Sequence, residues 1–221
     1  MLMKINNLNL EWTGHSGFFI TNSKKIYIDP YNLKYKEKAD IILITHSHYD
    51  HCSIEDLKKI VSDNCLVICP ADCSSKLTKL QEKIKIQNLE PGQEISLDSI
   101  KVKAVPAYNT NKQFHSKQEY WNGYILDFEG TKIYHAGDTD LIPEMSQIGK
   151  MKIDVALLPV SGVYTMNAEE AAKAAFIIKP KLAIPMHYSS IVGSREDAEK
   201  FRDLCEQEGI KVEVMENAFK E

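Results

Sequence analysis

The sequence predicts a mixed α/β protein, because short apolar runs typical of buried strands alternate with capped helical segments. The apolar run at residues 41–44 indicates a strand, and a capped helix follows at residues 53–60. The run at residues 155–160 is followed in the same way by an alanine-rich helix at residues 167–178. Between them, residues 124–135 indicate a hairpin around a Glu-Gly turn. The length of 221 residues suits one large domain or two small ones, and we expect a single domain over residues 1–221.

The remaining elements follow from turn and cap residues. Gly14 and Gly17 permit a tight turn between two strands within residues 8–20. Ser194 and Asp197 begin the last helix, and Gly209 ends it. Further strands are expected at residues 26–28, 65–69, 84–89, 94–97, 100–105, 181–185 and 211–215, and a further helix at residues 74–83.

The composition is that of an ordinary globular protein, with 43% hydrophobic and 26% charged residues. No apolar run of about 18 residues indicates a transmembrane helix. Residues 1–10 lack the hydrophobic core of a signal peptide, so we expect a cytoplasmic protein with no membrane partner. The net charge of −4 disfavours nucleic-acid binding by bulk charge, although a local basic patch stays open. We expect a small-molecule substrate, and a homo-oligomer stays open.

Cysteine usage indicates reduced thiols, because the count of five is odd and no signal peptide is expected. Cys65, Cys69 and Cys73 are spaced by four and could bind a metal. The strand-like run that ends before Pro70 instead favours buried, free thiols. Cys52 could face the site beside it, but packing is the favoured role.

Four candidate metal ligands fall within six residues. His46, His48, Asp50 and His51 lie between the strand at residues 41–44 and the following helix, where α/β proteins place ligand sites. Residues two apart in an extended segment point the same way, so His46 and His48 can reach one ion. Asp50 and His51 are adjacent, so the chain must turn to direct both inward. Imidazole and carboxylate groups are suitable ligands for zinc, manganese and iron. The alternative to a metal site is a solvated polar loop.

The run His-Ser-His-Tyr-Asp-His resembles the HxHxDH signature of the metallo-β-lactamase superfamily. The resemblance implies a four-layer αββα sandwich with up to two metal ions between the sheet edges. The order of later motifs is similar over roughly residues 12–188, most of all to small stand-alone hydrolases of the lactonase-like branch. Only about 50 residues separate Asp138 from His187, which leaves no room for the inserted domain of large RNA-processing members.

The resemblance also implies the rest of the ligand set. Asp138 lies in a Gly-Asp-Thr motif and would bridge two ions, which requires two acceptor oxygens on one side chain. His187 follows the strand at residues 181–185 and matches the closing histidine of the family. By the same match, one ion takes His46 and His48, with His115, Asn109 or water completing it. The other ion takes Asp50, His51 and His187.

One position departs from the family. Asn109 stands where relatives with a full site carry a third histidine, and a neutral amide is a weak ligand for a transition metal. His115 follows in a long polar loop and could supply the missing imidazole. It could instead contact the substrate or transfer a proton, or it could do neither. Asn109 could then contact the substrate.

Other residues near strand ends are candidates for supporting roles. His15 could contact the substrate or a metal ligand, or be structural. Asp29 could orient a ligand histidine, or simply form an Asp-Pro turn. Tyr108 and Tyr164 could touch the substrate, whereas Asp140 is expected to be a turn or capping residue.

By resemblance, the protein is expected to be a metal-dependent hydrolase that activates water with one or two divalent ions. Zinc is the first expectation, with manganese, iron or nickel as alternatives, and Asp50 and Asp138 are the expected catalytic carboxylates. The favoured substrate is a small ester, lactone or phosphodiester. The alternatives are a nuclease that uses Lys112 and Lys117 with loop aromatics, a β-lactam hydrolase, and a metal-binding protein with a degraded site.

Overall fold

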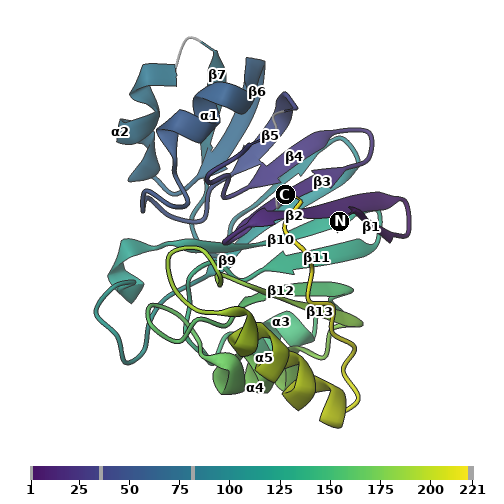
Figure 1. Cartoon of the computed structure of the whole chain (residues 1–221). Helices are drawn as coiled ribbons and strands as arrows, with labels where there is room; N and C mark the ends of the chain where they lie inside the picture. The colour runs from purple at the N-terminus through teal and green to yellow at the C-terminus, as the bar shows by residue number, and fades with distance from the viewer. Residues whose placement is uncertain (1, 35–36, 81–82, 219–221) are drawn as a thin grey trace. The chain divides into compact units, whose positions relative to one another are not determined.

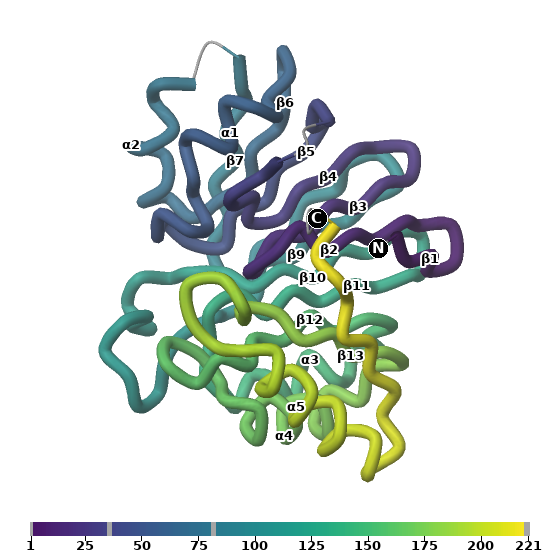
Figure 2. The backbone as a smooth tube through the Cα atoms, viewed as in Figure 1, coloured from purple at the N-terminus to yellow at the C-terminus, as the bar shows by residue number. Residues whose placement is uncertain are grey.

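The computed structural model describes residues 2–34, 37–80 and 83–218. The chain forms two compact units, one of Met1–Leu89 with Glu216–Glu221 and the other of Glu90–Met215. Each unit has its own sheet and its own helices (Figures 1 and 2). The predicted mixed α/β class is therefore confirmed. The prediction of a single domain over residues 1–221 stays a prediction.

In the first unit, the described strands follow one another across the sheet in sequence order, from β1 to β7. They pair antiparallel from β1 to β4 and parallel from β4 to β7. The strands are β1 Leu2–Ile5, β2 Leu8–Gly14, β3 Gly17–Thr21, β4 Lys25–Ile28, β5 Ala39–Leu43, β6 Val61–Cys69 and β7 Ile84–Asn88. The helices are α1 Ile54–Ile60, α2 Cys73–Leu77 and a 3-10 turn, Thr78–Leu80.

Helices α1 and α2 pack their apolar sides into one core with strands β3 to β6. Ser53 caps α1 as predicted, because its hydroxyl accepts a hydrogen bond from the N–H of Asp56 at 3.3 Å. All five cysteines are free and buried, as the reduced-thiol prediction expects. The core includes Ile42, Val67, Leu57, Ile60, Cys52, Cys69, Cys73 and Leu77.

The register of this sheet brings three polar segments to one edge. Phe18 pairs with Ile28, so the turn between β2 and β3 lies at the C-terminal end of β4. Ile28 in turn pairs with Leu43, the last residue of the parallel strand β5. The turn with His15, the end of β4 and the loop after β5 therefore share an edge.

The second unit contains a sheet with the described strand order β13-β12-β11-β10-β9-β8. Helix α4 packs on α3, α5 and β12, and α5 packs on β13. The strands are β8 Glu94–Leu97, β9 Ile100–Pro106, β10 Asn122–Phe128, β11 Thr131–His135, β12 Val155–Pro159 and β13 Leu182–Met186. The helices are α3 Met145–Gly149, α4 Ala168–Ile178, α5 Arg195–Gln207 and a 3-10 turn, Lys117–Glu119.

This sheet also gathers polar segments at one edge. Strands β11, β12 and β13 are parallel, so the segments that follow them leave from the same side. Tyr124 pairs with both His135 and Ala104, which places the end of β9 near the C-terminal end of β11. The segment after β9 therefore begins at the edge where β11, β12 and β13 end.

The predicted strand at residues 211–215 is wrong. Only one bridge forms there, between Ala183 and Val212, and Met215 beyond it is buried and accepts a hydrogen bond from Tyr188 at 3.4 Å. The predicted helix at residues 74–83 is also too long, since α2 and its 3-10 turn end at Leu80, and residues 81–82 lie outside the described residues. The pattern did not predict β1 or α3. Across the residues that the structure covers, no helix has the length and apolarity needed to cross a membrane.

Candidate metal centre

The loop after β5 holds the histidine-rich motif in a tight turn. The N–H groups of His51 and Cys52 both donate to the carbonyl of His48, at 3.1 and 2.8 Å. This is the turn that was predicted from the adjacent positions of Asp50 and His51. The ligand atoms of His15, Asp50 and His51 lie within 4.8 Å of one another.

Asp29 at the end of β4 orients His51. Its carboxylate accepts hydrogen bonds from the Nδ1 of His51 at 2.8 Å and from the hydroxyl of Thr45 at 2.6 Å. The backbone N–H of Thr45 donates to the other carboxylate oxygen at 2.8 Å. A carboxylate can only accept here, so His51 carries its proton on Nδ1. Asp29 is fully buried, and its contacts are those expected of a residue that orients a ligand histidine.

Thr45 links this arrangement to His46. Its hydroxyl hydrogen points to Asp29, so its oxygen accepts from the Nδ1 of His46 at 3.0 Å. The Nε2 of His46 lies 3.1 Å from the Nδ1 of His48. Two ligand atoms bound to one ion at about 2.0–2.2 Å lie about 3 Å apart, so this spacing suits a shared cation.

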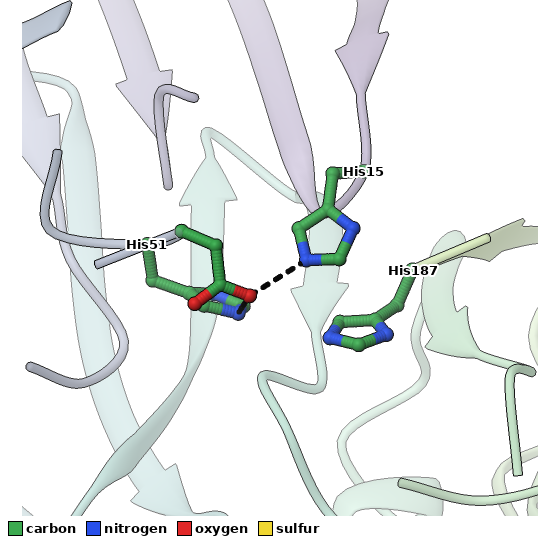
Figure 3. Close-up of side chains that lie close together, drawn as sticks. His15, His51 and His187 are labelled. Carbon is green, nitrogen blue, oxygen red and sulfur yellow. Dashed lines mark hydrogen bonds and ion pairs between the residues drawn. The ribbon is translucent and has the colours of Figure 1, made fainter. Parts of the chain in front are cut away.

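His15 contacts Asp50 from the turn between β2 and β3. Its Nε2 lies 2.9 Å from the Oδ2 of Asp50, and Figure 3 draws this contact as a dashed line. Its ring meets the ring of His51 edge-on at 5.5 Å. The indole N–H of Trp12 donates to the carbonyl of His15 at 2.9 Å and fixes the turn. Of the roles predicted for His15, these distances therefore favour contact with a candidate metal ligand.

In the second unit, Asp138 follows β11 and meets two histidines. Its Oδ2 lies 3.0 Å from the Nε2 of His187 and 3.5 Å from the Nε2 of His115. All three side chains are buried. The sequence left the role of His115 open, and the structure directs its Nε2 toward Asp138. Ser161, after β12, lies 3.1 Å from the Nδ1 of His187 and holds that ring.

Asn109 is engaged by protein partners at both ends of its amide. Its Nδ2 donates to the Oδ1 of Asp140 at 3.1 Å and to the carbonyl of Tyr164 at 2.9 Å. Both partners are acceptors, which fixes the orientation of the amide. Its Oδ1 then accepts from the backbone N–H of His115 at 3.1 Å and from its Nδ1 at 3.0 Å. Asn109 therefore positions His115.

The two tyrosines predicted to contact substrate have different surroundings. Tyr108 is buried, and its hydroxyl donates to Glu144 at 2.9 Å. Burial, and to a smaller extent the hydrogen bond to Glu144, raise the pKa of Tyr108. Tyr164 packs its ring edge-on against Phe114 at 4.7 Å. A substrate contact for either tyrosine stays a prediction.

Three residues at these strand ends have a left-handed backbone. The φ angles of His15, Asp29 and His187 are 53°, 44° and 61°. This region costs an ordinary residue about 1–2 kcal/mol. Such strain persists where the surrounding structure fixes it, most often at functional sites.

The comparisons with known proteins decide the family. Residues 9–187 match the family described as the Beta-lactamase superfamily domain. A UPF0173 metal-dependent hydrolase from Thermoplasma acidophilum is 36% identical over 221 residues, which cover 96% of this chain and 97% of that protein. The chain belongs to the metallo-β-lactamase superfamily. Within that superfamily it is a member of the UPF0173 metal-dependent hydrolases, and the prediction of a metal-dependent hydrolase is confirmed.

Solved structures confirm the metallo-β-lactamase fold. A candidate metal-dependent hydrolase from Parabacteroides distasonis matches with a TM-score of 0.83 and 33% identity, over 97% of this chain and 96% of that one. Igni18, a metallo hydrolase from Ignicoccus hospitalis, matches with a TM-score of 0.78 and 28% identity, over 95% of each chain.

In this metallo-β-lactamase superfamily member, four of the candidate histidines share one orientation. The Nδ1 atoms of His46, His51, His115 and His187 each face an oxygen, supplied by Thr45, Asp29, Asn109 and Ser161 respectively. A neutral imidazole with its proton on Nδ1 presents the lone pair of Nε2 for a metal or a proton. The donor chemistry in each unit therefore fits a divalent cation.

Residue patterns alone assign no role to Thr45, Ser161 or Glu144. The one feature of the sequence that could have indicated Thr45 and Ser161 is that each comes directly after a buried strand. Asp140, predicted to be a turn residue, accepts from the N–H of Thr110 at 2.8 Å and holds the start of the loop that carries His115.

Proposed function

We propose that the protein hydrolyses a small ester, lactone or phosphodiester with one or two divalent cations. Zinc is the preferred candidate for the cation. The observation that carries the proposal is the spacing of candidate ligand atoms within each unit. The Nε2 of His187 lies 3.0 Å from an oxygen of Asp138, and the nitrogens of His46 and His48 lie 3.1 Å apart. Atoms with lone pairs come this close when a proton or a cation lies between them.

The proposed ligands are those that the family resemblance implies. The first unit contributes His46, His48, Asp50 and His51. The second contributes Asp138, His187 and His115, with His115 preferred to Asn109 as a ligand. Asp50 and Asp138 are the proposed catalytic carboxylates, and His15 acts on Asp50 through their 2.9 Å contact.

Such a cation supplies a water of lowered pKa, about 7 for zinc, and stabilises negative charge that develops on the substrate. The protein's own residues prepare for it. Thr45, Asp29, Asn109 and Ser161 hold the imidazoles in one tautomer and one direction. Rings that are already fixed need not reorganise during the reaction. This is the basis of electrostatic preorganisation.

The nuclease alternative depends on cations beside aromatic rings. Lys112 forms an ion pair with Asp140, and Lys117 pairs with Glu144 at 2.9 Å. Both lysines are thus neutralised by carboxylates. Another group of lysines lines a groove near Lys101 and Lys132, at the strand ends opposite to Asp138. The pairing of Lys112 and Lys117 therefore favours a small substrate over a polynucleotide.

The degraded-site alternative rested on Asn109. Its hydrogen bonds to His115 give that position a supporting role, which weakens the reason to expect an inactive protein. β-Lactam hydrolysis, a cytoplasmic location and a homo-oligomer stay predictions.

The test combines metal analysis of the purified protein with a screen of esters, lactones, phosphodiesters and β-lactams. We expect one or two equivalents of zinc, manganese, iron or nickel, and turnover of at least one ester, lactone or phosphodiester. The variant Asp138→Asn keeps the side-chain shape but removes the charge. It should lower turnover by at least about a hundredfold and reduce metal content, because a charged ligand is lost.

The matched control is Asp63→Asn, which changes an exposed carboxylate on β6. It should bind metal and turn over substrate like the wild type. Full activity of Asp138→Asn would remove Asp138 from the mechanism. A protein that hydrolyses none of the four substrate classes in the presence of zinc, manganese, iron or nickel would support the degraded-site alternative.

A further inference from the structure

A hollow of about 320 Å³ lies in the second unit, where β9 ends and the long loop returns. Its volume is at the lower end of the range of about 300–1,000 Å³ that small-molecule sites occupy. The residues that line the hollow include Pro91, Pro106, Tyr108, Lys117, Tyr120 and Trp121.

The walls of this hollow are flat, apolar and held in place. Trp121 and Tyr108 are largely buried, and the N–H of Ala107 donates to the carbonyl of Trp121 at 3.1 Å. Tyr120 is 63% exposed and has a left-handed backbone with a φ of 54°, where it ends the 3-10 turn. An exposed aromatic ring beside two buried ones is suited to cover an apolar guest.

The hollow has a cation at one wall, but that cation is neutralised. The Nζ of Lys117 lies 2.9 Å from Glu144, 3.2 Å from the hydroxyl of Tyr108 and 4.5 Å from the centre of its ring. Burial acts to raise the pKa of Glu144, but its hydrogen bonds with Lys117 and Tyr108 outweigh burial and lower it, so the carboxylate stays charged at neutral pH. An anion would have to displace Glu144, whereas an uncharged group would not.

One wall of the hollow contacts the histidine that the proposed function uses. The ring of Trp121 meets the ring of His115 edge-on at 5.5 Å. Tyr108 directly precedes Asn109, whose Oδ1 accepts from the Nδ1 of His115 at 3.0 Å. Trp121 therefore both lines the hollow and contacts His115.

We propose that this hollow is the specificity subsite for an uncharged aromatic group of the substrate. The inference rests on the proposed function and names its substrate class, which is aryl-bearing esters or lactones. A phenyl-sized group would stack between Tyr120 and the Trp121 wall, and its reacting carbonyl would lie on the His115 side. Anionic substituents on the ring would gain nothing from Lys117.

Direct binding tests the hollow without turnover. The probe is 4-nitrobenzyl alcohol, a nitroaromatic quencher, titrated into the full chain while tryptophan fluorescence is recorded. The chain has two tryptophans, so Trp121→Phe identifies the signal from the hollow. We expect saturable quenching that Trp121→Phe abolishes, and about tenfold weaker binding in Tyr120→Ala. The anion 4-nitrobenzoate should bind at least about tenfold more weakly than the alcohol.

Phe114→Ala is the matched control, because Phe114 is a 51% exposed aromatic in the same loop that does not line the hollow. It should keep the wild-type affinity, and the melting temperatures of both variants should match that of the wild type. Quenching that does not saturate, or equal affinity in Tyr120→Ala and the wild type, would overturn the subsite.

Turnover separates this inference from the proposed function. Tyr120→Ala should lower kcat/KM for ethyl phenylacetate about tenfold and leave ethyl acetate, which has no aromatic group, unchanged. Binding of the alcohol without hydrolysis of either ester would count against the proposed function and leave the subsite standing. Hydrolysis of both esters with no change in Tyr120→Ala would support the proposed function and overturn the subsite.

Discussion

At the residue scale, the decisive property of each histidine is which ring nitrogen the protein holds. Thr45 serves two residues at once, since it donates to Asp29 and accepts from His46. The valine side chain has nearly the same shape as threonine but lacks the hydroxyl. Position 45 is therefore the place where orientation can be removed with little change in packing.

We expect Thr45→Val to weaken metal binding by about 10–100-fold, because the Nδ1 of His46 loses the oxygen that orients its ring. Equilibrium dialysis with zinc measures this affinity, and a melting curve without metal reports any loss of stability. Thr45→Ser keeps the hydroxyl and should restore the affinity. Wild-type affinity in Thr45→Val would show that His46 needs no orientation from Thr45.

At the element scale, helix α1 is tied to the chain after β4 through one carboxylate. Asp56 accepts hydrogen bonds from the N–H groups of Asn32 and Leu33 at 2.8 and 2.9 Å. It also accepts from Ser53 at 2.7 Å and from Lys59 at 2.8 Å. These bonds anchor the helix that follows the histidine-rich loop.

Burial acts to raise the pKa of Asp56, but the hydrogen bonds from Lys59, Ser53, Leu33 and Asn32 outweigh it and lower the pKa. A carboxyl whose pKa is lower in the folded state stabilises the protein above about pH 4, and this stability is lost as pH falls through the folded pKa. We expect Asp56→Asn to cost about 1–3 kcal/mol at neutral pH, measured by urea unfolding.

The difference between Asp56→Asn and the wild type should shrink as the pH falls below about 4. Asp63→Asn, on the exposed side of β6, serves as the control and should show no such difference. A constant difference between Asp56→Asn and the wild type at all pH values would assign the effect to shape rather than charge.

At the scale of the whole molecule, each unit concentrates its candidate ligands at one sheet edge. The buried carboxylates of Asp29 and Asp138 and the histidines around them are costly to hold in a folded chain without a cation. A cation that binds only the folded state stabilises it by about 2.7 kcal/mol at a hundred times its Kd.

Chelation should therefore lower the melting temperature, by about 5–10 °C from a fully loaded protein of this size. Adding zinc or manganese back should restore it, and magnesium should do so less, because imidazole ligands disfavour it. Asp138→Asn should show a smaller shift than the wild type. Identical melting curves with and without chelator would argue against a resident cation.

Local patterns predicted most elements and the segments that carry the candidate site. The capped helix after the histidine-rich motif and the helix from Asn167 formed as expected, because caps and apolar spacing are properties of neighbouring residues. The 211–215 segment failed for the opposite reason. Its alternation suits a strand, but pairing depends on a partner elsewhere in the chain, and only Val212 forms a bridge with Ala183.

The sequence by itself determined the kinds of candidate ligand, their order and the family, because these depend on residue identity and spacing. The tertiary structure alone decided that Asn109 supports His115 and that Thr45 and Ser161 hold ring nitrogens. The physical reason is that hydrogen bonds join residues far apart in the chain: Asn109 bonds to a carbonyl 55 residues away, and Ser161 bonds to a ring 26 residues away. Which nitrogen of an imidazole can meet a cation is fixed by those distant partners.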